Sequence, residues 1–113
     1  MSRIYHVCRL DEWNSAVKTG FYSGSSQDAG DGFIHFSSKD QVFNSVTKHR
    51  AGQDNLVMLS VDSNLLGESL KWEPSKKGEL FPHVYGTLSL QAVKDVYPLL
   101  LGSDGLPIFP VTY

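Results

Sequence analysis

The stretch "NLVMLSVD" at residues 55–62 is apolar at nearly every position. A strand that buries only one face alternates apolar and polar residues, whereas a strand covered on both faces reads as a continuous apolar run. We therefore expect residues 55–62 to form the central strand of the fold, with the other elements arranged around it.

Five further strands are predicted around this central one. Residues 3–9, "RIYHVCR", alternate, so that Ile4, His6 and Cys8 share one face and Tyr5 and Val7 the other. The remaining strands are "FIHFS" (33–37), "SLKWE" (69–73), "ELFPHVYG" (79–86) and "KDVYPLLL" (94–101).

Residues 10–20, "LDEWNSAVKTG", predict the first helix. Asp11 is a suitable N-cap, and Gly20 is a suitable C-terminal stop. The apolar stripe expected to face the core consists of Trp13, Ala16 and Val17.

A second helix is predicted to begin after Ser38, which forms a capping box with Gln41. We expect Gly52 to end it. Its expected buried residues are Val42, Phe43 and Val46, and a short additional helix is expected in "LSLQAV" (88–93) after Ser89.

The order of the elements points to an α+β fold, because strands and helices do not alternate strictly and several connections are too short for crossover helices. We predict one domain over residues 1–113, with a mixed or antiparallel sheet and two to three short helices. Its core should lie within about 4–98, with the tail 99–113 wrapping the surface. Residues 23–32, "SGSSQDAGDG", are expected to be a mobile loop.

Charge and composition exclude several classes of protein. A net charge of −2 over 113 residues offers no general attraction to polyanions, which disfavours an extended nucleic-acid surface. The single cysteine, Cys8, excludes an internal disulfide and a cysteine-rich metal site. No apolar run approaches the ~18 residues of a membrane span, and no signal peptide is recognisable. We expect a soluble cytoplasmic protein.

Three of the four histidines, His6, His35 and His83, lie in predicted strands among apolar or aromatic neighbours. One interpretation is that the three imidazoles converge on one cleft. Another is that each is a core residue whose ring nitrogens bond backbone carbonyls. A third is a catalytic zinc site, but the ligand pairs at i,i+2 or i,i+4 that preorganise such sites are missing, so we expect no metal.

The charged stretch around residues 71–79 offers two carboxylates, Glu73 and Glu79. Glu73 directly follows Trp72 at a strand end, and a partly desolvated carboxylate there would interact strongly with a developing positive charge. The alternative is a solvated loop with Trp72 in the core. A serine nucleophile is disfavoured, because Ser37 and Ser38 lack the G-x-S-x-G context and no phosphate-binding glycine loop occurs.

Three motifs together, "IYHV" (4–7), "DGFIHFSS" (31–38) and "LKWEPSKKGELFPHVYG" (70–86), carry a family resemblance. They resemble the bacterial family catalogued as domain of unknown function 952, over about residues 4–98. Members of that family are similar to the ADP-ribosyltransferase fold, which includes the RNA 2′-phosphotransferases. The resemblance implies a split pair of small antiparallel sheets around a cleft for a nicotinamide dinucleotide.

The resemblance also implies roles for individual residues. His6 matches the position that holds the adenosine side of the dinucleotide, and Glu73, with Glu79 second, matches the glutamate that orients the nicotinamide ribose. His83 belongs to the narrower family's own motif and is expected to act as a general base. The remaining ligand-binding candidates are Phe33, His35, Ser37, Trp72 and Tyr85.

The leading hypothesis is an ADP-ribosyltransferase-like enzyme with NAD as its substrate. It would break the bond to nicotinamide through an oxocarbenium-like state that Glu73 stabilises. One alternative is a non-catalytic module that binds a nucleotide or another small ligand. A second is a metal-dependent hydrolase using the three histidines. The oligomeric state is left open.

Overall fold

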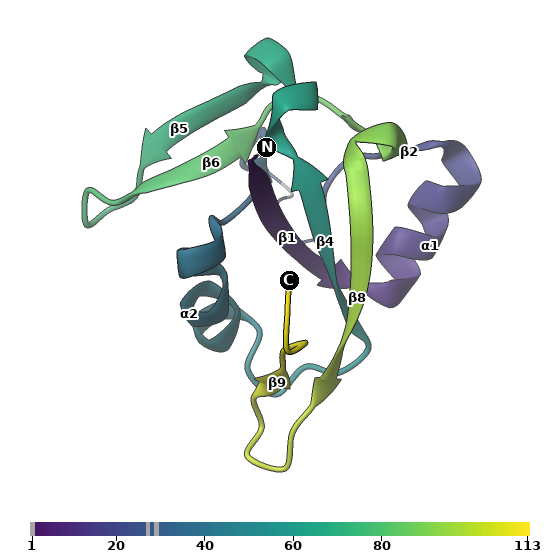
Figure 1. Ribbon diagram of the computed structural model, residues 1–113, viewed down its shortest axis with the longest axis vertical. Coiled ribbons are helices and arrows are strands. Elements are labelled where there is room, and N and C mark those ends of the chain that lie inside the picture. The colour runs from purple at the N-terminus through teal and green to yellow at the C-terminus, as the bar shows by residue number, and fades with distance from the viewer. Residues whose placement is uncertain (1, 27, 29) are drawn as a thin grey trace.

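The computed structural model describes residues 2–26, 28 and 30–113, and it has the predicted α+β composition (Figure 1). Its largest sheet is antiparallel throughout, with the strand order β1-β4-β8-β9. The strands of this sheet are β1 (Arg3–Arg9), β4 (Leu56–Asp62), β8 (Val93–Leu101) and β9 (Pro107–Ile108).

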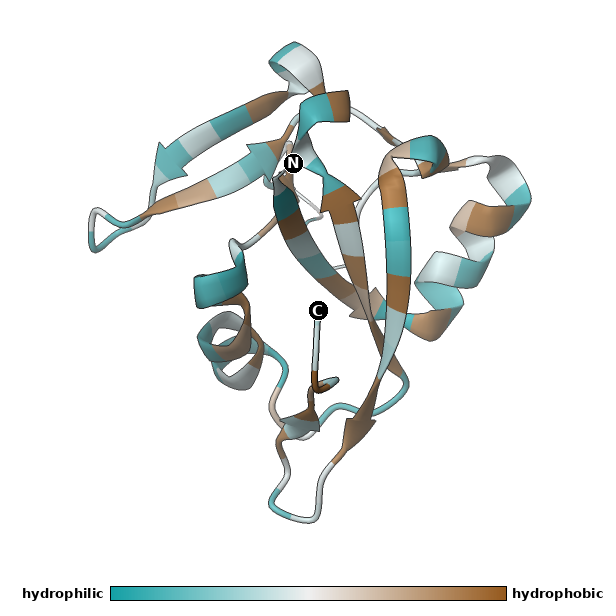
Figure 2. Ribbon diagram, in the orientation of Figure 1, coloured by the Kyte–Doolittle hydropathy of each residue, from teal (hydrophilic) through white to brown (hydrophobic). Residues whose placement is uncertain are grey.

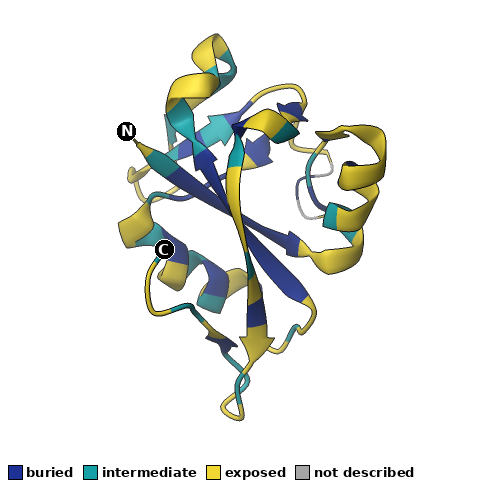
Figure 3. Ribbon diagram, turned by 45° about the vertical axis from the view of Figure 1, so that its right-hand side comes forward, coloured by how far each residue is buried: buried dark blue, intermediate teal, exposed yellow. Residues whose placement is uncertain are grey.

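Strand β4 is the central strand, as its sequence predicts. Every residue from Leu56 to Val61 is buried, and Figure 3 shows β1 and β4 as the buried middle of the molecule. Two apolar clusters lie on opposite sides of this strand pair. Figure 2 shows that β4 is hydrophobic along most of its length. Helix α1 (Leu10–Thr19) supplies Ala16 to one cluster, and α2 (Lys39–His49) supplies Val42 and Val46 to the other.

Two smaller antiparallel sheets complete the fold. One has the order β3-β6-β5, from Ile34–His35, Leu80–Val84 and Leu70–Pro74, and its β5–β6 hairpin projects from the body (Figure 1). The other pairs β2 (Phe21–Tyr22) with β7 (Leu88–Ser89). Short 3-10 helices occur at Ser63–Leu65, Gly67–Ser69 and Leu90–Ala92. All six predicted strands are present, although β3 is shorter than predicted. The short strands β2, β7 and β9 were not predicted, and β7 occupies the start of the segment expected to be a helix.

Helix α1 begins and ends close to its predicted limits, but its cap differs. The backbone N–H of Arg9 donates to Glu12 Oε1 at 2.8 Å, so Asp11 lies in the first turn and is not the N-cap. Gly20 ends the helix with a φ of 93°, a left-handed conformation that suits glycine. Val17 is 55% exposed, so its assignment to the buried stripe was wrong.

Helix α2 has the predicted capping box, in which the Ser38 N–H donates to Gln41 Oε1 at 3.0 Å. The helix ends at His49 with Arg50 as its C-cap, earlier than the predicted Gly52. Phe43 is largely exposed, contrary to expectation, and its ring packs on Phe109 of the C-terminal tail.

The loop 23–32 and the tail complete the chain. Residues 27 and 29 lie outside the described residues, so the predicted mobility of this loop remains a prediction. Two of its polar residues, Ser25 and Asp28, are buried, which composition alone did not indicate. Tyr113 and Phe109 of the tail pack against the apolar cluster beneath α2. The predicted boundary at residue 99 was wrong, because Leu99 is a core residue of β8 and Pro107–Ile108 form β9 of the largest sheet. In the described part of the chain, no helix is long and apolar enough to span a membrane.

Candidate functional site

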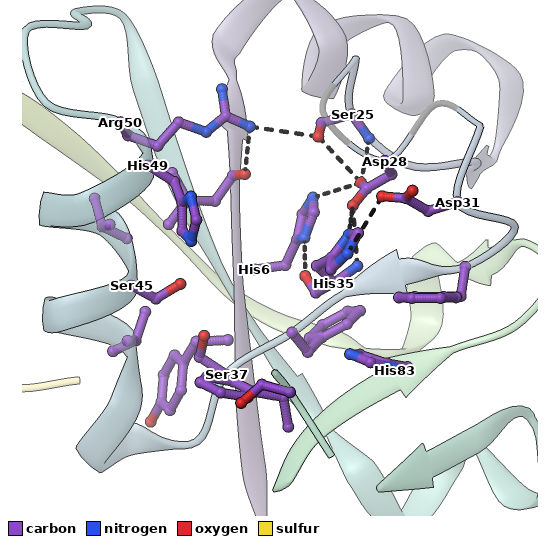
Figure 4. A pocket seen from close by; sticks show the side chains of 18 of the residues that line it. His6, Ser25, Asp28, Asp31, His35, Ser37, Ser45, His49, Arg50 and His83 are labelled. Atoms are coloured by element: carbon purple, nitrogen blue, oxygen red, sulfur yellow. Dashed lines mark hydrogen bonds and ion pairs between the residues drawn. The ribbon is translucent and has the colours of Figure 1, made fainter. Parts of the chain in front are cut away.

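A cleft of about 620 Å³ lies between α2 and the β3-β6-β5 sheet, with β1 at its base (Figure 4). This volume is within the range of small-molecule sites in proteins. Its polar lining includes His6, Ser25, Asp28, Asp31, His35, Ser37, Ser45, His49, Arg50, Lys76 and His83. All three strand histidines therefore line a single cleft, as predicted.

The register of the small sheet places two of these histidines side by side. His35 on β3 pairs directly with His83 on β6, and their ring centroids are 5.5 Å apart. Neighbouring positions on the same strands, Ile34 and Val84, point to the opposite face and are fully buried in the core. One face of this sheet therefore packs in the core, and the other face presents the two imidazoles to the cleft.

The imidazole of His35 lies between two carboxylates of the loop 23–32. Nδ1 is 2.6 Å from Asp28 Oδ1, and Nε2 is 3.4 Å from Asp31 Oδ2. The hydrogen bond to Asp28 raises the pKa of His35, although partial burial opposes the shift. The two carboxylates therefore favour the protonated form of His35, which lines the cleft.

Asp28 is the buried anchor of this arrangement. Its Oδ2 accepts hydrogen bonds from the backbone N–H and the hydroxyl of Ser25, and its Oδ1 accepts from the backbone N–H and Nδ1 of His35. Burial alone would raise the pKa of Asp28, but these hydrogen bonds and the nearby His6 hold it well below its usual range. An ionised carboxylate only accepts, so Nδ1 of His35 carries a hydrogen.

His83 has its own carboxylate, Glu73. His83 Nδ1 is 2.8 Å from Glu73 Oε1, which also accepts the Tyr85 hydroxyl at 2.7 Å. The hydrogen bonds from Tyr85 and His83 lower the pKa of Glu73. The His83 ring also stacks on Phe33, with centroids 4.1 Å apart and an interplanar angle of 18°. Since the ionised Glu73 carboxylate only accepts, Nδ1 of His83 carries a hydrogen, and Nε2 makes no hydrogen bond or ion pair with a described residue.

His6 differs from the other two histidines. It is buried at the base of the cleft, with Nδ1 bonded to the carbonyl of His35 and Nε2 2.7 Å from the Tyr22 hydroxyl. Burial lowers its pKa, despite the nearby Asp28. The ring is therefore neutral with both nitrogens satisfied, which matches the core interpretation for this one histidine.

Arg50 brings a buried positive charge to the cleft. Its guanidinium donates to the Val7 carbonyl at 3.0 Å, to Gln53 Oε1 at 3.1 Å and to Ser25 Oγ at 3.3 Å. Among the described residues, no carboxylate lies within ion-pair distance of it. Neither Arg50 nor Asp28 was identified from the sequence, since each lies outside any periodic or recognised motif.

Only some of the other predicted site residues line the cleft. Ser37 lines the cleft, whereas Glu73 and Tyr85 lie behind His83 and do not line it. Trp72 is largely exposed, and strand alternation places it on the opposite face of β5 from Glu73. The expected shielding of Glu73 by the adjacent indole is therefore replaced by contacts with His83 and Tyr85.

Glu79, the second predicted carboxylate, is bonded elsewhere. Its Oε2 accepts from Gln41 Nε2 at 3.0 Å, so it ties the hairpin to α2. Within the described residues, no three His, Cys, Asp or Glu side chains are grouped to hold a metal ion.

The sequence model described as "Protein of unknown function (DUF952)" matches residues 7–96. The chain belongs to the DUF952 family. The resemblance identified from the sequence motifs covered nearly the same residues, about 4–98. A crystal structure of protein CC0527 from Caulobacter crescentus is similar to this DUF952 chain, with 41% identity and a TM-score of 0.90 over 95% of this chain and 94% of that one. Its solution NMR structure gives 42% identity and a TM-score of 0.83, over 95% and 92% of the two chains. No functionally curated protein matches.

Proposed function

We propose that the cleft binds a phosphate-bearing nucleotide, with NAD as the first candidate, and that the protein cleaves or transfers from it in the manner of an ADP-ribosyltransferase. The observation that carries this proposal is the arrangement of His83, which is held by Glu73, stacked on Phe33 and placed in the same cleft as the buried Arg50. The choice of NAD rests on the motif resemblance.

The lining suits a planar base joined to phosphates. Phe33 lines the cleft and stacks one ring face on His83, so a base would stack on its other face. The cations His35, Arg50 and Lys76 outnumber the carboxylates Asp28 and Asp31, which favours an anionic ligand.

In the proposed reaction, His83 Nε2 accepts the proton of a water or acceptor hydroxyl that attacks C1′ of the nicotinamide ribose. The new C1′–O bond forms while the C1′–N bond breaks, and its electron pair leaves with neutral nicotinamide. Glu73, which lies behind His83, orients the ring through Nδ1 and offsets the positive charge that the ring gains as it accepts the proton. Loss of such a group costs about 100-fold in turnover.

The test is Glu73→Gln, assayed by calorimetric affinity for NAD and by nicotinamide release. We expect affinity to change little and turnover to fall by about 100-fold. Glu79→Gln is the matched control, because Glu79 bonds Gln41 and not a histidine, and it should retain both properties.

Three outcomes would change the conclusion. Absence of NAD binding in the wild type would refute NAD as the ligand. Tight binding without turnover, across several acceptors, would favour the binding-module alternative. Activity that appears only with an added divalent metal would favour the hydrolase alternative.

We place the activity in the cytoplasm, whose reducing conditions suit the single buried thiol of Cys8.

A further inference from the structure

His35 and His83 form a matched pair that the glycosidic reaction does not fully use. Each donates Nδ1–H to a carboxylate, Asp28 at 2.6 Å and Glu73 at 2.8 Å. Their rings meet edge to face at 71°, and both line the cleft. Two histidines with different charge environments can divide the roles of general acid and general base.

The surrounding charges differ in a way that assigns these roles. His35 faces two carboxylates, Asp28 and Asp31, which favour its protonated form. His83 faces one carboxylate, Glu73, which also accepts the Tyr85 hydroxyl. His35 therefore suits the acid and His83 the base. Other charged or titratable groups near the pair include Lys71, which pairs with His83 across β5–β6, and His6 and His49, whose pKa values are lowered in part by the charge of His35. Arg50 and Lys76 line the same cleft.

We propose that His35 and His83 hydrolyse a small phosphodiester, such as a ribonucleoside 2′,3′-cyclic phosphate, by general acid–base catalysis. His83 Nε2 takes a proton from a water whose oxygen forms the new P–O bond. His35 Nε2–H gives its proton to the departing ribose oxygen as the other P–O bond breaks, leaving a nucleoside monophosphate. Both rings return to their starting states by proton exchange with solvent. This reaction does not require that the protein cleave NAD.

The cleft is suited to the charge of this substrate. A phosphodiester is a monoanion, and Arg50 and Lys76 lie in the same lining as the two histidines. The contact between His35 Nε2 and Asp31 is 3.4 Å, longer than an ordinary N–H···O hydrogen bond, and the Asp31 side chain is half exposed. The leaving oxygen of the substrate can therefore replace the Asp31 carboxylate as the partner of His35 Nε2.

The test compares two leaving groups. A ribonucleoside 2′,3′-cyclic phosphate releases an alkoxide that needs a proton, whereas thymidine 5′-(4-nitrophenyl phosphate) releases a nitrophenolate that does not. The variants are His35→Asn and His83→Asn, since the asparagine amide still donates to Asp28 or Glu73 where Nδ1 did. The control is Lys77→Asn, at an exposed turn position outside the cleft lining.

We expect His83→Asn to lose ~100-fold or more on both substrates, because the base is needed for each. His35→Asn should lose ~100-fold or more on the cyclic phosphate and less than about 10-fold on the nitrophenyl ester. Lys77→Asn should retain both rates. Thermal melting of each variant confirms that it is folded.

Two results would overturn the proposal: no turnover of either ester by the folded wild type, or equal losses on both esters in His35→Asn. Nicotinamide release is measured on the same preparations. Ester hydrolysis without NAD cleavage would refute only the glycosidic reaction, and NAD cleavage without ester hydrolysis would refute only the phosphodiester reaction.

Discussion

Replacing Asp28 with asparagine should remove the main polar anchor of the cleft. The Asp28 side chain is 5% exposed, and its carboxylate accepts four hydrogen bonds, two from Ser25 and two from His35. Asparagine has one oxygen and one NH₂ group. The NH₂ group would therefore face the hydrogen-bond donors of either Ser25 or His35 and could not accept from them. Removing one partner of a buried ion pair typically costs about 3–5 kcal/mol, and we expect the free energy of unfolding to fall by this amount.

Urea denaturation monitored by tryptophan fluorescence measures this loss. With an m-value of about 1.5 kcal/mol per molar, a loss of ~3 kcal/mol moves the midpoint by about 2 M. The matched control is Asp31→Asn, whose half-exposed carboxylate is 3.4 Å from His35 and should contribute no more than about 1 kcal/mol. If Asp28→Asn and Asp31→Asn shifted the midpoint equally, Asp28 would not be the anchor.

The pH dependence gives an independent check. The pKa of Asp28 is lowered on folding, so its stabilisation is complete above its unfolded pKa of about 3.9 and is lost as the pH falls below it. The pKa of His35 is raised on folding, so its stabilisation is complete below about 6.5 and is lost as the pH rises through the folded value. The difference in the free energy of unfolding between wild type and Asp28→Asn should therefore be largest between about pH 4 and 6.5. A difference that did not vary with pH would contradict this account.

Three further predictions concern residues around the cleft. Tyr22→Phe removes the hydroxyl that bonds His6 Nε2 and should destabilise the protein by about 1–3 kcal/mol in thermal denaturation, because a buried ring nitrogen loses its partner; an unchanged melting temperature would refute this. Burial raises the pKa of the Cys8 thiol to about 11, so a thiol reagent should modify it at neutral pH only after unfolding, and rapid labelling of the native protein would count against its burial. Gly20→Ala forces a side chain into a left-handed C-cap and should cost about 1 kcal/mol by urea denaturation, whereas stabilisation would contradict the observed cap.

The sequence predicted those features that depend on local pattern. The apolar run 55–62 located the central strand, and Ser38 with Gln41 located the start of α2. Asp28 and Arg50 were missed because they reach the cleft from a loop and from a helix end, where no periodicity marks a buried charge.

Long-range geometry explains the remaining differences. Trp72 has the sequence pattern of a core residue, but the β5–β6 hairpin extends beyond the core and leaves the indole largely exposed (Figure 1). The burial of Phe43 was overestimated because the helical stripe on α2 is narrower than its apolar residues suggest.

The pairing of β1 with β4 has a consequence for how the protein folds. Arg9 pairs with Leu56, so the entire segment 10–55, including α2 and the loop that holds Asp28, lies within a loop that this pairing closes. Closing a loop of that length costs entropy before the pairing is stabilised, and sheets built from such distant strands fold in milliseconds to seconds. If the cleft is completed only after the central strands have paired, a bound ligand would leave the folding rate almost unchanged and would lengthen the lifetime of the native state by slowing unfolding.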